Sequence, residues 1–127
     1  MLKFIFSFLL ILYSSLTFSQ SLFPFKVNDL WGYIDSLGME VISPKYPTAG
    51  FFSEGFAYVQ IGEVLGYINV TGREVIKAKY PAANSFYEGF AGVMEDEDWG
   101  VINAKGEMVI EPMYAAPLTF HDGLARF

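Results

Sequence analysis

The chain has 127 residues, a formal net charge of −6 and no cysteine. That length suits one small domain or a short repeat array. The acidic balance disfavours nucleic acid, whose phosphates require basic patches, and it disfavours an electrostatic hold on anionic membranes. The absence of cysteine excludes disulfides and thiolate metal sites, so we expect aromatic packing to supply the core.

Residues 1–19 have the organisation of a secretory signal peptide. Lys3 supplies a positive start, residues 4–12 are apolar apart from one serine, and small polar residues follow. The apolar stretch is short for a bilayer span, which needs roughly 20 residues; a membrane anchor is the alternative. We expect cleavage between Ser19 and Gln20, a secreted or periplasmic bacterial protein, and no stable membrane insertion afterwards.

Residues 20–127 contain the same unit three times, with a period of 34 residues and no gap. A fixed period of this size indicates a repeat array, in which each unit buries its apolar face against its neighbours. The positions that define the repeat are Trp31, Gly32, Gly38, Tyr46, Gly55, Gly66, Gly72, Tyr80, Gly89, Trp99, Gly100, Gly106, Tyr114 and Gly123.

Glycine and proline spacing favours strands over the helix pairs that share this period. These residues interrupt every window long enough for such a helix. We therefore expect an all-β array of three antiparallel three-stranded meanders, with a small closed or propeller-like ring as the alternative arrangement. The expected meanders cover residues 22–43, 56–77 and 90–111, and a terminal strand covers 124–127.

Each expected meander contains a turn that ends in glycine. Asp35–Gly38 fits because the aspartate accepts backbone N–H groups and glycine tolerates a positive φ. Asn69 and Asn103 begin the equivalent turns. We expect Pro44 and Pro112 to end the last strands of their meanders. A connector follows, with a tyrosine and a phenylalanine six residues apart that should fill the gap between units.

The terminal strand, residues 124–127, is predicted to lack a hairpin partner. An unpaired edge offers free N–H and C=O groups to a neighbouring chain. We expect either that further repeats follow or that the chain self-associates through this edge. If the edge is closed within the chain, a ring becomes the better arrangement.

The repeated residues resemble the WG-repeat family, also called KWG repeats and found mostly in bacterial proteins. The resemblance is carried by Trp31–Asp35, Ile110–Tyr114 and Phe120–Ala125. Leu65 replaces the tryptophan in the second copy, and Val101 replaces the aromatic residue in the third. The resemblance implies an all-β repeat array used for interaction, and it brings no catalytic residues.

Candidate chemical groups are few. His121 is the only histidine, so we interpret it as a loop residue rather than a ligand or general base. Glu54, Glu88 and Asp122 recur before a glycine; they could form a ladder of carboxylates, and we favour turn stabilisation over acid–base work because equivalent residues have equivalent surroundings.

The run Glu95–Asp98 could supply oxygen ligands for calcium, but we interpret it as a solvated hairpin tip because it lacks the alternation and glycine of a calcium loop. Asn69 fits a glycosylation pattern, although we expect it to serve a turn. We expect no metal and no cofactor.

Trp31, Tyr33, Tyr67 and Trp99 could form a stripe that stacks on sugar or peptide, but aromatic residues at repeat spacing are more typical of a core between units. We expect an exported, noncatalytic binding or scaffold module with a protein partner at the cell envelope. The alternatives are a carbohydrate-binding module that uses a polysaccharide partner, and a noncatalytic repeat region of a larger enzyme.

Overall fold

The computed structural model describes residues 21–126, and every regular element in this part of the chain is a β-strand. The predicted signal peptide and the cleavage position between Ser19 and Gln20 lie outside the described residues. Within residues 21–126 the predicted all-β fold class is therefore confirmed.

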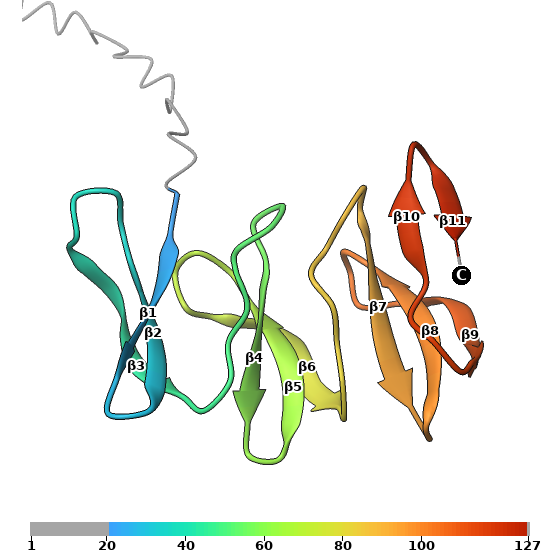
Figure 1. Cartoon of the computed structure of the whole chain (residues 1–127), viewed down its shortest axis with the longest axis horizontal. Coiled ribbons are helices and arrows are strands. Elements are labelled where there is room, and N and C mark those ends of the chain that lie inside the picture. The colour runs from blue at the N-terminus through green and yellow to red at the C-terminus, as the bar shows by residue number, and fades with distance from the viewer. Residues whose placement is uncertain (1–20, 127) are drawn as a thin grey trace, which may run out of the picture.

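Nine strands form three antiparallel sheets, one for each predicted meander (Figure 1). Neighbouring strands in the sequence are neighbours in each sheet, as in a hairpin-linked meander. The strands are β1 (Phe23–Val27), β2 (Leu30–Ile34) and β3 (Glu40–Tyr46); β4 (Ala57–Ile61), β5 (Val64–Ile68) and β6 (Glu74–Tyr80); and β7 (Phe90–Glu95), β8 (Asp98–Asn103) and β9 (Met108–Tyr114).

The last strand of each meander is longer than predicted. We expected Pro44 and Pro112 to end their strands, but β3 continues through Pro44 to Tyr46 and β9 continues through Pro112. The pairing of β2 with β3 shifts register between Trp31 and Tyr33, and Pro44 lies opposite this shift. A proline is tolerated at a bulge in an edge strand because no ladder bond requires its missing N–H.

The predicted glycine turns are confirmed. Gly38 has a φ of +78°, and its N–H donates to the carbonyl of Asp35 at 3.0 Å. The Asp35 carboxylate accepts from the N–H of Met39 at 2.9 Å. Asn69 and Asn103 make the equivalent side-chain bonds in the later meanders. The amide oxygen of Asn69 therefore has the turn role expected from the sequence.

The connectors pair with the meanders that follow them. Ala49 forms an isolated bridge with Val59 of β4, and Gly50 donates to the carbonyl of Tyr58 at 2.9 Å. Ala83 forms the equivalent bridge with β7. Because connector and sheet share backbone bonds, each unit is tied to the next through main chain as well as side chains.

The C-terminal strand is not alone. β10 (Thr119–His121) pairs antiparallel with β11 (Leu124–Arg126), so our expectation of a stray strand at 124–127 is wrong; its partner precedes it in the chain and is not a following Trp-Gly strand. The cause is a tight turn in which Asp122 and Gly123 both have positive φ, as type I′ hairpins require. His121, expected in a loop, instead ends β10.

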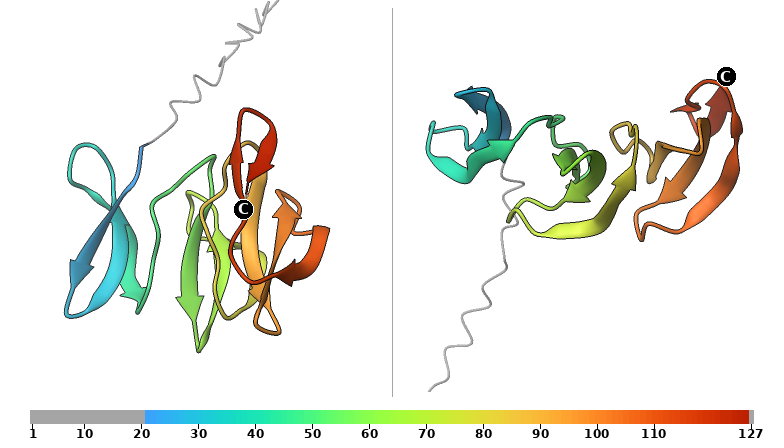
Figure 2. Two further views of the ribbon diagram at one scale, coloured as in Figure 1. Left: turned by 45° about the vertical axis from the view of Figure 1, so that its right-hand side comes forward. Right: turned by 90° about the horizontal axis from the view of Figure 1, so that it is seen from below.

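The apolar core lies between meanders. One cluster joins Tyr33, Ile42 and Tyr46 to Val59 and Ile68 of the second meander, and a second cluster joins the second meander to the third in the same way. Figure 2 shows the sheets in an open row, with the first meander at one end and the β10–β11 hairpin at the other. The ring alternative is therefore not the arrangement of the described residues.

Candidate interaction surface

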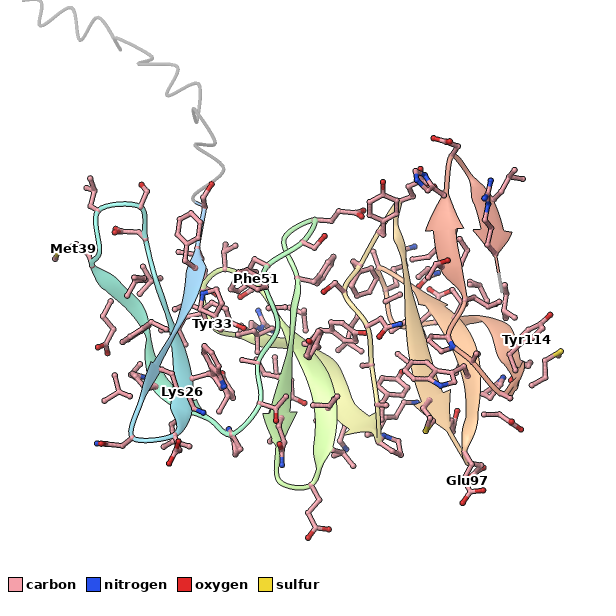
Figure 3. The ribbon with its side chains drawn as sticks, in the orientation of Figure 1. Lys26, Tyr33, Met39, Phe51, Glu97 and Tyr114 are labelled. Carbon is pink, nitrogen blue, oxygen red and sulfur yellow. The ribbon has the colours of Figure 1, made fainter. Side chains whose placement is uncertain are left out.

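The aromatic residues at the repeat positions are mainly core residues. Tyr33 and Tyr67 are 0% exposed, and Trp99 is 9% exposed. Trp31 is partly buried, and the ammonium of Lys26 lies 5.5 Å from the centroid of its ring. Figure 3 shows Tyr33 between the first two meanders. The core interpretation is confirmed, and these rings do not form an exposed stacking stripe.

The buried tyrosines hold connectors in place through their hydroxyl groups. Tyr33 donates to the carbonyl of Gly50 at 2.7 Å, and Tyr67 donates to the carbonyl of Asn84 at 2.6 Å. Burial raises the pKa of both phenols well above the usual value because it disfavours the charged phenolate. Both groups therefore remain protonated donors at neutral pH.

A second pair of repeat tyrosines has weaker polar contacts. Burial raises the pKa of Tyr46 and of Tyr80, and the carboxylates of Glu74 and Glu95, respectively, raise them further. Within residues 21–126, the Tyr80 hydroxyl is the one buried side-chain polar atom without a hydrogen-bond partner. Tyr80 therefore contributes packing, while its hydroxyl is a cost to stability.

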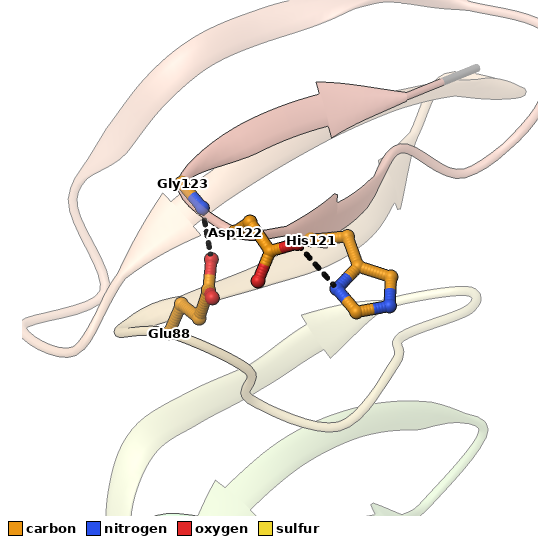
Figure 4. A network of polar contacts seen from close by, with 4 residues as sticks. All are labelled: Glu88, His121, Asp122 and Gly123. Atoms are coloured by element: carbon orange, nitrogen blue, oxygen red, sulfur yellow. Dashed lines mark hydrogen bonds and ion pairs between the residues drawn. The ribbon is translucent and has the colours of Figure 1, made fainter.

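The recurring carboxylates link successive connector turns. Glu54 accepts from the N–H of Gly89 at 2.8 Å. Glu88 accepts from the N–H of Gly123, also at 2.8 Å (Figure 4). The sequence interpretation of turn stabilisation missed that the stabilised turn belongs to the next repeat. Each carboxylate lies 35 residues before the glycine that it contacts, but the sequence alone does not show that these two positions meet.

Asp122 and His121 are surface groups. The Asp122 carboxylate lies 3.8 Å from the imidazole Nδ1 of His121, and both side chains are largely exposed (Figure 4). The ring of His121 faces Tyr87 edge-on at 6.4 Å. No group of three or more histidine, acidic or cysteine side chains suited to a metal occurs in the described part of the chain.

The acidic run Glu95–Asp98 forms the tip of the β7–β8 hairpin, as predicted. Asp96 and Glu97 occupy the two central turn positions and both have positive φ. Figure 3 shows Glu97 at the lower tip of the third meander. The four side chains are exposed, which agrees with a solvated tip.

One surface repeats along the array on the outer side of the third strands. Figure 2 shows β3, β6 and β9 along the same side of the row. The valine at the first outward position is 38–47% exposed in all three strands, and two more exposed residues follow at alternating positions. We call this surface the third-strand face; it comprises Val41, Ser43, Lys45, Val75, Lys77, Lys79, Val109, Glu111 and Met113.

The third-strand face is built from edge strands. β3, β6 and β9 each have one hydrogen-bonded neighbour in their sheets, namely β2, β5 and β8. Each strand buries alternate residues, such as Ile42 and Tyr46 in β3, against the core. The opposite alternation leaves apolar and charged side chains exposed on the outer side of each edge strand.

A family model described as a WG-containing repeat matches the chain three times, over residues 31–64, 66–97 and 99–127. The chain belongs to the WG-repeat family. Neither the comparison with curated proteins nor that with solved structures finds a match. In the described residues of this WG-repeat chain, no helix has the length and apolar character needed to cross a membrane.

The WG repeats make the chain a repeat-containing domain whose structural units are offset from the family matches. Each match begins at the second strand of a meander, whereas the meander begins one strand earlier. The sequence located this offset correctly from the strand at residues 56–60 and its copies. The candidate surface that sequence reasoning missed is the third-strand face, although the valine repeated at every period was its visible signal.

Proposed function

We propose that the chain is an exported, noncatalytic WG-repeat module that binds protein at the cell envelope through the third-strand face. The single observation that carries the proposal is the recurrence of an exposed valine at the same place on β3, β6 and β9. A repeated apolar position along one side of an array suits an extended partner that contacts every unit.

The backbone supports the same mode of binding. A partner strand that adds to β3, β6 or β9 gains main-chain hydrogen bonds except at Pro44 and Pro112, which lack an N–H, and at Ala78, whose N–H donates to Glu74. Alternating side chains of the partner then contact the exposed residues of the face. Lys45, Lys77 and Lys79 lie on the part of this face that β3 and β6 supply, which favours acidic residues in the part of the partner that contacts these two strands.

The carbohydrate alternative depended on an exposed, coplanar row of aromatic rings. Tyr67 and Trp99 are buried, and Trp31 is partly covered beside Lys26. Those rings are therefore poorly available for stacking on a sugar, which is why we favour protein over polysaccharide as the partner.

A photo-crosslinking amino acid at Val75 tests the proposal in the exported protein. Val70 is a matched control, because it is a valine with 38% exposure against 41% for Val75 but lies outside the third-strand face. We expect discrete protein crosslinks from position 75 and few from position 70. Equal crosslinking from both positions, or none from position 75, would refute binding through this face.

A further inference from the structure

The third copy of the repeat has a valine where the other two have a buried tyrosine. Val101 occupies the position of Tyr33 and Tyr67. The Tyr67 ring meets Phe86 edge-on with the ring centroids 4.9 Å apart, and Phe120 is the equivalent of Phe86 one repeat later. A valine side chain cannot fill the place of a phenol ring. Phe120 therefore lacks the edge-on tyrosine contact that Phe52 and Phe86 make in the first two copies.

A pocket of about 400 Å³ opens at this position. Its walls include Phe90, Val101, Ile110 and Phe120, whose counterparts one repeat earlier pack in the cluster around Tyr67. The lining is mostly apolar, and its rim residue Val109 is 47% exposed. The pocket is therefore lined like the site that Tyr67 fills, but it can be reached from outside.

The residue equivalent to the hydrogen-bond partner of the Tyr67 hydroxyl lies beside the pocket. Tyr67 donates to the carbonyl of Asn84, and Leu118 is the residue equivalent to Asn84 in the third copy. Leu118 is 3% exposed and lines a neighbouring hollow of about 240 Å³, which shares Phe90 and Phe120 with the pocket. Phe90 and Phe120 already stack with their ring centroids 5.2 Å apart, so a bound phenol would meet Phe120 edge-on, as Tyr67 meets Phe86, and would not lie between the two rings.

The mouth of the pocket is acidic. Glu88 lines it and is fixed there by the hydrogen bond that its carboxylate accepts from Gly123. Asp122 lies next to Gly123 with its side chain 91% exposed. Cationic groups beside a bound ring would therefore be attracted, whereas carboxylates would be repelled.

We propose that this pocket binds a tyrosine side chain of a partner protein, with basic residues next to that tyrosine. The bound ring completes the third copy from outside in the way that Tyr33 and Tyr67 complete the first two from within. This inference rests on the proposed protein-binding function and specifies one anchoring residue of the partner. Buried aromatic anchors of this kind commonly dominate the energy of an interface.

A capped tripeptide with tyrosine between two lysines tests the proposal against the same peptide with alanine in the centre. Binding is followed through the backbone amide signals of the protein in NMR spectra. We expect saturable shifts around Val101, Ile110 and Phe120, and at least tenfold weaker binding of the alanine peptide. Equal binding of the two peptides, or shifts confined to other parts of the chain, would overturn the proposal.

Val101→Tyr supplies the missing ring from within and is expected to reduce binding of the tyrosine peptide at least tenfold. Val101→Phe also places a ring in the pocket and should block it in the same way. It serves as the test if Val101→Tyr does not fold. A folded variant that binds the peptide like the parent would overturn the proposal. Crosslinking from position 75 tests the third-strand face separately from the pocket. If the peptide binds but position 75 gives no crosslinks, only the third-strand face is refuted as the binding surface.

Discussion

Two buried tyrosines should respond in opposite ways to removal of the phenol hydroxyl. The hydroxyl of Tyr67 donates to the carbonyl of Asn84 at 2.6 Å, whereas the hydroxyl of Tyr80 is buried and has no partner among the described residues. Both side chains are at most 1% exposed. Tyr67→Phe and Tyr80→Phe therefore delete the same atom from similar surroundings, and the pair isolates the effect of the hydrogen bond.

The expected magnitudes follow from the cost of making and losing buried hydrogen bonds. Tyr67→Phe loses a net contribution of about 1 kcal/mol and leaves the part-buried Asn84 carbonyl without this donor, so we expect a total loss of about 1–2 kcal/mol. Such a loss should lower the Tm by about 5–12 °C in a domain of this size. Tyr80→Phe removes an unpaired polar group, so stability should be unchanged or rise by up to about 2 kcal/mol.

Equilibrium unfolding in urea, followed by circular dichroism, measures both variants against the parent. Equal m-values would show that the same surface is exposed on unfolding, so that midpoints can be compared directly. The reasoning would be refuted if Tyr67→Phe were as stable as the parent, or if Tyr80→Phe lost as much stability as Tyr67→Phe. The first result would mean that the bond from Tyr67 to the connector between the second and third meanders adds no stability, and the second that the hydrogen bond does not distinguish the two hydroxyls.

Gly72→Val should lower the free energy of unfolding by about 1–3 kcal/mol, because Gly72 has a φ of +83° and an added Cβ would lie 3.3 Å from an isoleucine. Gly38 has a φ of +78°, but an added Cβ there would meet nothing, so Gly38→Val should lower the free energy of unfolding by less than Gly72→Val does. Equal urea midpoints for the two variants would refute a contribution from the isoleucine contact at Gly72. Burial raises the pKa of Tyr33 and Tyr67 in the folded chain, so both phenols lose their protons at a lower pH in the unfolded chain than in the folded one. The free energy of unfolding should therefore be constant below about pH 10. Above it, that free energy should fall by up to about 1.4 kcal/mol per pH unit for each phenol. A flat urea midpoint between about pH 10 and 11.5 would contradict this. Amino-terminal sequencing of exported protein should begin at Gln20 or within a residue or two, whereas an intact Met1 would indicate an anchor.

The sequence predicted the elements that depend on local chemistry and period. The glycines at turn ends, such as Gly38, have the positive φ that their position suggested. The offset between sequence repeat and meander was also predictable, because residues 22–26 match the strands that open the later meanders. Burial of Tyr33 and Tyr67 followed from the need of each unit to cover its apolar face with a neighbour.

What the sequence did not predict depends on contacts between units. The connector's pairing with β4 through Ala49 and Val59 is a long-range backbone match that no local pattern encodes. The same holds for the bond between Glu54 and Gly89, because identical turns in isolation do not reveal which neighbour they contact. Pro44 was misleading for a related reason: the bulge that tolerates it is a property of the pairing with β2.

The central claim is an open row of equivalent meanders that presents the same face at every repeat. Spin labels at Asp29, Glu63 and Glu97 report on it directly, because these exposed residues occupy equivalent hairpin tips one period apart. Pairwise distances from electron-spin resonance should show the separation between positions 29 and 97 as the longest, close to the sum of the two neighbouring separations. Three similar separations would contradict the open row and indicate that the meanders close into a ring.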